Sequence, residues 1–158
     1  FDKSGTVTAG NASSINDAAA AVVLMERGAA EAAGHTPLGR LVGYSHAGVE
    51  PQYMGIGPVP AVRKLLDRTG LSIGDIDVFE VNEAFAAQAL AVARDLELPP
   101  EKVNPNGSGI SLGHPIGATG AILTIKALYE LQRSGGRYAL VTMCIGGGQG
   151  IAAIFEKL

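Results

Sequence analysis

The sequence predicts a layered α/β domain with a mixed sheet, and three observations lead to this prediction. Beyond Pro60, apolar segments of helical period alternate with short apolar runs of strand length, in the order α-β-α-β-α-β-β. The last two strands are separated by too few residues for a crossover and should pair antiparallel, whereas strands separated by helices should be parallel. With 158 residues, 47% of them apolar and 17% charged, the chain can bury a sizeable core.

The first fifty residues supply helices and a strand that cannot form a domain alone. Asn16 or Asp17 can cap a helix over 18–28, which is apolar on nearly all sides and should therefore be buried. A short helix over 29–33 follows, and residues 38–45 alternate loosely, as a strand does. We expect these elements to complete a sheet whose other strands lie outside this chain.

The remaining residues carry the elements of the mixed sheet. Residues 47–60 hold three prolines and three glycines, which predicts a loop or boundary. In chain order, the expected elements are a helix from Pro60 to Gly70, a strand over Ile76–Val81, a helix over Ala84–Leu96, a brief strand at Val103–Asn104, a helix over Gly117–Arg133, a strand over Tyr138–Cys144, a turn at Gly146–Gly148 and a final strand over Ile151–Phe155.

Composition narrows the possible partners. The net charge is −3 and lysines and arginines do not cluster, which argues against nucleic acid as a partner. No apolar run reaches the roughly 18 residues of a membrane span. The single cysteine, Cys144, rules out an internal disulfide framework and suits a reducing, cytoplasmic setting. Because the chain opens on Phe1 with no initiator methionine or signal peptide, we expect it to be part of a longer protein.

The glycine-rich stretch Asn104–Gly120 is the first candidate site. Its glycines predict a strand-to-helix turn, in which backbone amides can approach a ligand closely. His114 precedes Pro115, which biases the histidine towards an extended conformation at the entrance of the next helix. A rigidly held imidazole among N–H donors suits acid–base chemistry. The alternative is a structural turn with an incidental histidine.

Three polar side chains follow predicted strands: Asn82, His114 and Cys144. The carboxyl ends of strands in an open α/β sheet form the edge where ligands bind. Cys144 precedes Gly146–Gly148, and the flexible glycine backbone can direct an N–H towards the sulfur, as an oxyanion site requires. The alternative is that Cys144 is a buried, inert cysteine. Asn82 could orient a water or a carbonyl, or simply cap a helix. His35 and His46 have no metal-binding partner at useful spacing, and no metal is expected.

Together these stretches resemble the thiolase family. The resemblance runs from end to end and rests on five motifs in order, which are Thr8–Ser13 (TAGNAS), Met54–Pro58 (MGIGP), Asn82–Ala86 (NEAFA), Gly113–Gly120 (GHPIGATG) and Cys144–Gly150 (CIGGGQG). Ser14 and Ile122 depart from the family pattern, in which glycine and arginine are common at these two positions.

The resemblance implies reversible Claisen condensation or thiolysis of 3-ketoacyl-CoA, with coenzyme A thioesters as substrates and no other cofactor. By this resemblance Cys144 is the acid/base, and His114 activates the nucleophile and donates to the thioester oxygen. Asn82 holds a water that completes this oxyanion hole, the Gly146 amide contributes to a second one, and Ser13 contacts CoA.

The family's fold is two similar α/β halves packed face to face. The resemblance assigns residues 1–50 to the last helix and strand of the first half and residues 51–158 to the C-terminal domain. It also implies a homo-oligomer, a dimer or tetramer. The family's nucleophilic cysteine belongs to the first half, so we expect this chain to be inactive alone. The alternative is a non-catalytic module that binds CoA or a lipid, but Asn82, His114 and Cys144 argue against it because binding does not require all three.

Overall fold

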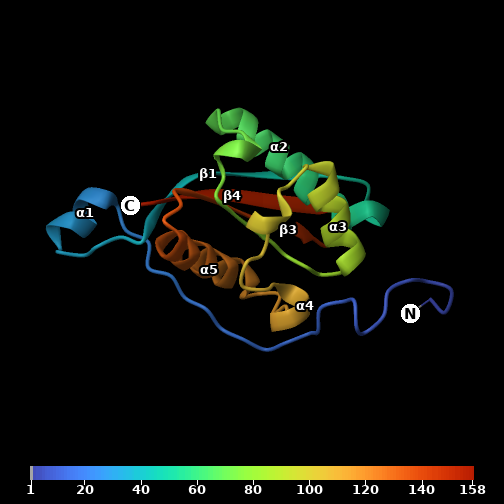
Figure 1. Cartoon of the computed structure of the whole chain (residues 1–158). Coiled ribbons are helices and arrows are strands. Elements are labelled where there is room, and N and C mark those ends of the chain that lie inside the picture. The colour runs from blue at the N-terminus through green and yellow to red at the C-terminus, as the bar shows by residue number, and fades with distance from the viewer. Residues whose placement is uncertain (1) are drawn as a thin grey trace.

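The computed structural model describes residues 2–158 and contains one mixed sheet of four strands (Figure 1). The strands are β1 (Gly39–Gly48), β2 (Val78–Val81), β3 (Tyr138–Ile145) and β4 (Gln149–Lys157), and they lie in the order β1-β4-β3-β2. β4 pairs antiparallel with both β1 and β3, whereas β2 pairs parallel with β3. The mixed α/β class and both expected strand directions are therefore confirmed.

Helices cover the two faces of this sheet. α2 (Pro58–Thr69) and α3 (Ala86–Asp95) lie on one face, and α5 (Thr119–Ser134) lies on the other with the single turn α4 (Gly109–Leu112) near its start (Figure 1). The remaining helical elements are α1 (Arg27–Ala32) and 3₁₀ turns at Pro51–Ile56, Ile73–Asp75 and Pro100–Lys102. The three layers follow from the need of each helix to bury one apolar stripe.

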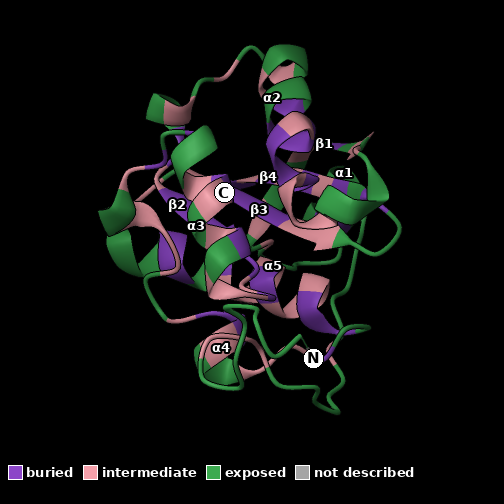
Figure 2. Ribbon diagram, turned by 90° about the vertical axis from the view of Figure 1, so that its right-hand side faces the viewer, coloured by how far each residue is buried: buried purple, intermediate pink, exposed green. Residues whose placement is uncertain are grey.

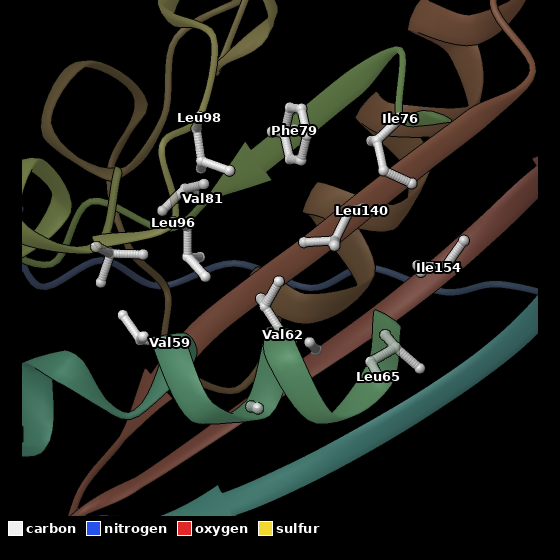
Figure 3. Packing of buried hydrophobic residues seen from close by; sticks show 13 residues of the cluster. Val59, Val62, Leu65, Ile76, Phe79, Val81, Leu96, Leu98, Leu140 and Ile154 are labelled. Carbon is white, nitrogen blue, oxygen red and sulfur yellow. The ribbon is translucent and has the colours of Figure 1, made fainter. Parts of the chain in front are cut away.

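Two hydrophobic clusters, one on each side of the sheet, hold the layers together. On the α2 side, Val62 and Leu65 pack with strand residues that include Phe79, Leu140 and Ile154 (Figure 3). The cluster on the α5 side consists of Val78, Leu123, Ala127, Leu131, Ala139 and Val141. Strand neighbours such as Val78 and Phe79 point to opposite faces, so a short strand serves both clusters.

Most of the helices and strands from Pro58 onwards were predicted correctly from apolar periodicity and from the glycines at element ends. α2 ends at Gly70, which adopts the left-handed conformation that favours glycine at a helix end. The brief strand expected at Val103–Asn104 reduces to a single parallel bridge between Val103 and Phe79. α4 was not expected, because a four-residue helix is too short to show a hydrophobic period.

The helix expected over 18–28 is wrong. Residues 16–26 are not helical and follow an extended course along the α5 side, and only Arg27–Ala32 forms a helix there (Figure 1). Much of this segment is exposed (Figure 2): Val23 and Leu24 are 90% and 88% accessible. A helix gains most of its stability from packing one apolar face against a core, and the described residues leave most of this run exposed.

The strand expected at 38–45 is present as β1, but its predicted location is wrong. β1 pairs with β4 along its whole length instead of completing a sheet outside this chain. Sequence order suggested otherwise, because β1 and β4 are about a hundred residues apart. The division of the chain near residue 50 stays a prediction, and Phe1 lies outside the described residues.

Candidate active site

The carboxyl ends of β2 and β3 bring two of the predicted site residues to one edge of the sheet. Val81 pairs with Thr142, and the N–H of Asn82 donates to the carbonyl of Thr142 at 3.0 Å. Cys144 follows two residues later on β3. Parallel pairing of these strands thus places Asn82 and Cys144 at the same end of the sheet.

Asn82 and His114 are in contact, although 32 positions separate them. Asn82 is fully buried, and its Nδ2 lies 3.3 Å from Nε2 of His114. Phe85, not Asn82, is the N-cap residue of α3, so helix capping does not explain the buried amide. Among the described residues, Oδ1 of Asn82 has no hydrogen-bond partner, and Asn82 also lines a cavity of about 20 Å³, large enough for one water.

The surroundings of His114 hold both its backbone and its ring. Its N–H donates to Oδ1 of Asn16 at 3.0 Å, and its Nδ1 lies 2.7 Å from Oγ1 of Thr119. Gly113 has φ +96°, and a Cβ there would lie 2.5 Å from the Asn16 side chain. Burial lowers the pKa of His114 below its ordinary value, which favours the neutral imidazole, with one free lone pair, at pH 7.

Cys144 lies opposite Gly150 in the β3–β4 hairpin. Its side chain is partly buried, and this burial raises the pKa of the thiol. The described residues contain no hydrogen bond between Cys144 and either His114 or Asn82. Gly146 opens the turn of the hairpin, is exposed, and has open space where a side chain would stand. The raised pKa therefore favours the protonated thiol. The accessible backbone of Gly146 lies two residues further along the chain.

The N-terminal segment crosses the site and connects its two loops. The N–H of Ser13 donates to the carbonyl of Ala84 at 2.9 Å, just beyond Asn82. Three residues later, Asn16 holds the backbone of His114. Ser13 thus contacts the Asn82–Ala86 stretch and lies three residues before the side chain that holds His114. Asn16 was considered only as a helix cap in the sequence, because a contact across 98 positions leaves no local signal.

A buried ion pair supports the loop from beneath. Nζ of Lys126 on α5 donates to Glu80 of β2 at 2.8 Å and also to the carbonyl of Gly107. The Glu80 side chain is fully buried and that of Lys126 is 16% exposed. Burial raises the pKa of Glu80, an effect that the ammonium of Lys126 opposes. The pair therefore ties β2, α5 and the glycine-rich stretch together.

The β3–β4 hairpin is held against the loop before α2 by two glycines. A Cβ on Gly150 would overlap the backbone of Gly57, and one on Gly57 would overlap Gln149 and Gly150. Gly57 belongs to the MGIGP stretch and Gly150 to the CIGGGQG stretch. The two backbone segments therefore approach closely beside Cys144, and only glycine at both positions permits this approach.

We expect Gly150→Ala to lower the free energy of unfolding by about 1–3 kcal/mol, since the added methyl group must displace backbone. Urea denaturation followed by circular dichroism measures the change. Gly146→Ala in the same hairpin is the matched control and should stay within about 0.5 kcal/mol of the unchanged chain, because its Cβ meets nothing within 4 Å. Equal effects of the two substitutions would contradict the close-packing explanation.

Comparison with known families agrees with the five motifs. The family model described as "Thiolase, C-terminal domain" matches residues 35–157. The chain belongs to the thiolase family. The model described as "Thiolase, N-terminal domain" matches residues 1–28.

Known thiolases match the whole chain. Beta-ketothiolase BktB of Cupriavidus necator is 71% identical over 156 residues, which cover 99% of this chain and 40% of that protein. The crystal structure of the Bacillus anthracis acetyl-CoA acetyltransferase has a TM-score of 0.98 at 54% identity. That of human mitochondrial 3-ketoacyl-CoA thiolase in complex with CoA has a TM-score of 0.92 at 48% identity. Both structural matches cover 100% of this chain and 40% of the solved one. The thiolase chain described here thus spans 40% of the length of these relatives.

Two further features of this thiolase chain concern metal-binding groups and membrane-spanning helices. Within residues 2–158, no three histidine, cysteine, aspartate or glutamate side chains are grouped so that they could hold a metal ion. No helix in that part of the chain is long and apolar enough to cross a membrane.

Proposed function

We propose that this chain is the C-terminal part of a thiolase that catalyses reversible Claisen condensation and thiolysis of 3-ketoacyl-CoA. The observation that carries the proposal is the contact between the Asn82 amide and the His114 imidazole, at the sheet edge that also holds Cys144. The reaction forms a carbanion next to a thioester, and this requires fixed donors where negative charge develops, in a site that excludes water.

His114 and Asn82 are proposed to form one oxyanion site. A neutral imidazole can take a proton from a nucleophile and then donate the resulting Nε2–H to the thioester oxygen. The lowered pKa of His114 supports this role, because the resting ring must be neutral. The unpartnered Oδ1 of Asn82 and the adjoining cavity of about 20 Å³ support a water held by Asn82.

Cys144 is proposed to move the α-proton of the substrate and to protonate the leaving thiol. A thiol with a raised pKa is a weaker acid, and its thiolate is a correspondingly stronger base. The same raised pKa, and a thiol with no hydrogen bond to His114 within residues 2–158, argue against a hydrolytic Cys144–His114 dyad. The exposed backbone at Gly146 is proposed to supply an N–H to the second oxyanion site, and Ser13 to contact CoA.

The remaining partners are proposed to be the N-terminal part of the enzyme and further copies of it. Ile15, Val23 and Leu24 are each at least 88% exposed, which supports a protein surface that covers this segment in the complete enzyme. We further propose a homo-oligomer, a dimer or tetramer, in the cytoplasm, with coenzyme A thioesters as substrates and no other cofactor.

A chimaera tests the proposed function. The chain replaces its matching 156-residue segment in Cupriavidus necator BktB, and thiolysis of acetoacetyl-CoA by CoA is measured. We expect turnover by the chimaera and none by the 158-residue chain alone, because its one cysteine is assigned to proton transfer. A chimaera that folds, as judged by circular dichroism, but does not turn over would refute the proposal, and thiolysis by the chain alone would refute the assignment of Cys144. Acylation of Cys144, seen by intact-mass spectrometry, would indicate hydrolytic chemistry instead.

A further inference from the structure

The second nitrogen of the His114 ring, on the side away from Asn82, is held by the hydroxyl of Thr119. Oγ1 of Thr119 lies 2.7 Å from Nδ1 of His114 and 3.0 Å from the carbonyl oxygen of Pro115. Thr119 is 3% exposed and is the first residue of α5. The hydroxyl is therefore fixed between the two groups, without competition from bulk water.

The proton count of this arrangement defines the direction of each hydrogen bond. The hydroxyl of Thr119 donates its single proton to the carbonyl of Pro115, an acceptor that it shares with the N–H groups of Ala118 and Thr119. The hydroxyl can then only accept from His114, which requires the ring proton to be on Nδ1. A neutral imidazole with Nδ1–H has its lone pair on Nε2, and Nε2 accepts from the Asn82 amide, 3.3 Å away.

We infer that Thr119 is a positioning residue that fixes the Nδ1–H tautomer of His114 and so keeps the free lone pair on Nε2, the nitrogen that faces Asn82. The inference rests on the proposed function, since it explains how the same nitrogen first accepts a proton and then donates it. With Nδ1 held by Thr119, neither step requires the ring to rotate.

A hydroxyl in this position has a different effect from a carboxylate. A carboxylate beside Nδ1 would favour the imidazolium, whereas a neutral hydroxyl orients the ring without an opposite charge. No carboxylate hydrogen-bonds to the His114 ring in the described part of the chain. Thr119 thus orients the base and leaves it neutral.

The test compares Thr119→Val with Thr119→Ser and with a matched control in the chimaera described above. Thr124→Val is the control, because the Thr124 hydroxyl on the same helix also donates to a carbonyl four residues back, that of Gly120, at 2.8 Å. We expect Thr119→Val to lower kcat by about 10- to 100-fold with KM within about twofold, by analogy with the loss seen when a metal-bound histidine loses its orienting partner. Thr119→Ser should recover most of kcat, and Thr124→Val should leave it unchanged.

A tautomer measurement separates this inference from the proposed function. Solid-state ¹⁵N NMR of the histidine-labelled chimaera, with the His114→Asn spectrum subtracted, reports which ring nitrogen carries the proton. We expect a protonated Nδ1 in the unchanged protein and in Thr119→Ser, and a mixture of tautomers in Thr119→Val. A protonated Nε2 in the unchanged protein, or equal kcat values for Thr119→Val and Thr124→Val, would overturn the inference. An inactive but folded chimaera with a protonated Nδ1 would instead refute only the proposed function.

Discussion

Replacement of His114 by asparagine should lower kcat/KM of the chimaera by about 10³-fold, within the 10²- to 10⁴-fold range that a general acid–base group contributes. Asparagine retains a polar side chain but cannot accept and return a proton. The variant should keep its fold, because the side chain of His114 is only partly buried. Initial rates of acetoacetyl-CoA thiolysis at several substrate concentrations give the result.

His35→Asn is the matched control for this substitution. His35 is exposed, lies beyond the end of α1, and is not part of the site. Its replacement should leave kcat/KM within about twofold, as expected for a surface position away from the chemistry. Unchanged activity of the His114 variant would mean that another group activates the nucleophile.

Lys126→Met should lower the free energy of unfolding of the chain by about 3–5 kcal/mol, the usual cost when one partner of a buried ion pair is removed. The substitution leaves Glu80, which is fully buried, without its cation, and removes a donor to the carbonyl of Gly107. Burial already raises the pKa of Glu80, so the carboxyl should become protonated more readily still in the variant. Urea denaturation at pH 7, followed by circular dichroism, measures the loss.

Two further variants separate the charge from the packing. Lys64→Met places the same change on an exposed helical position of α2 and should cost less than about 0.5 kcal/mol. Addition of Glu80→Gln to Lys126→Met removes the unpaired charge and should restore part of the lost stability. If Lys126→Met and Lys64→Met were equally mild, the ion pair would not support the glycine-rich stretch.

Much of this fold could be predicted from the sequence, because helix ends and tight turns are determined by residues that are neighbours in the chain. A helix that ends at Gly70 and a hairpin that turns at Gly146–Gly148 are determined by backbone preferences of glycine and by short loop length. The common sheet edge of Asn82 and Cys144 was likewise predictable, since each of these residues follows a predicted strand. The motifs that contain them also indicated the thiolase family.

Local signals failed where the structure depends on distant partners. The run of alanines and valines after Asp17 has the composition of a buried helix, but residues 16–26 are extended and mostly exposed, without the packing surface from which a helix gains most of its stability. The place of β1 beside β4 was missed for the same reason.

The sequence by itself therefore determined the α/β class, most elements from Pro58 onwards, and the residue types of the candidate site. Only the tertiary structure decided that the Asn82 amide meets His114, that Asn16 and Thr119 hold the histidine on two sides, and that Lys126 lies beneath the loop. The physical reason is that a hydrogen bond requires a particular distance and direction. Those are defined only when segments far apart in the chain pack against one core.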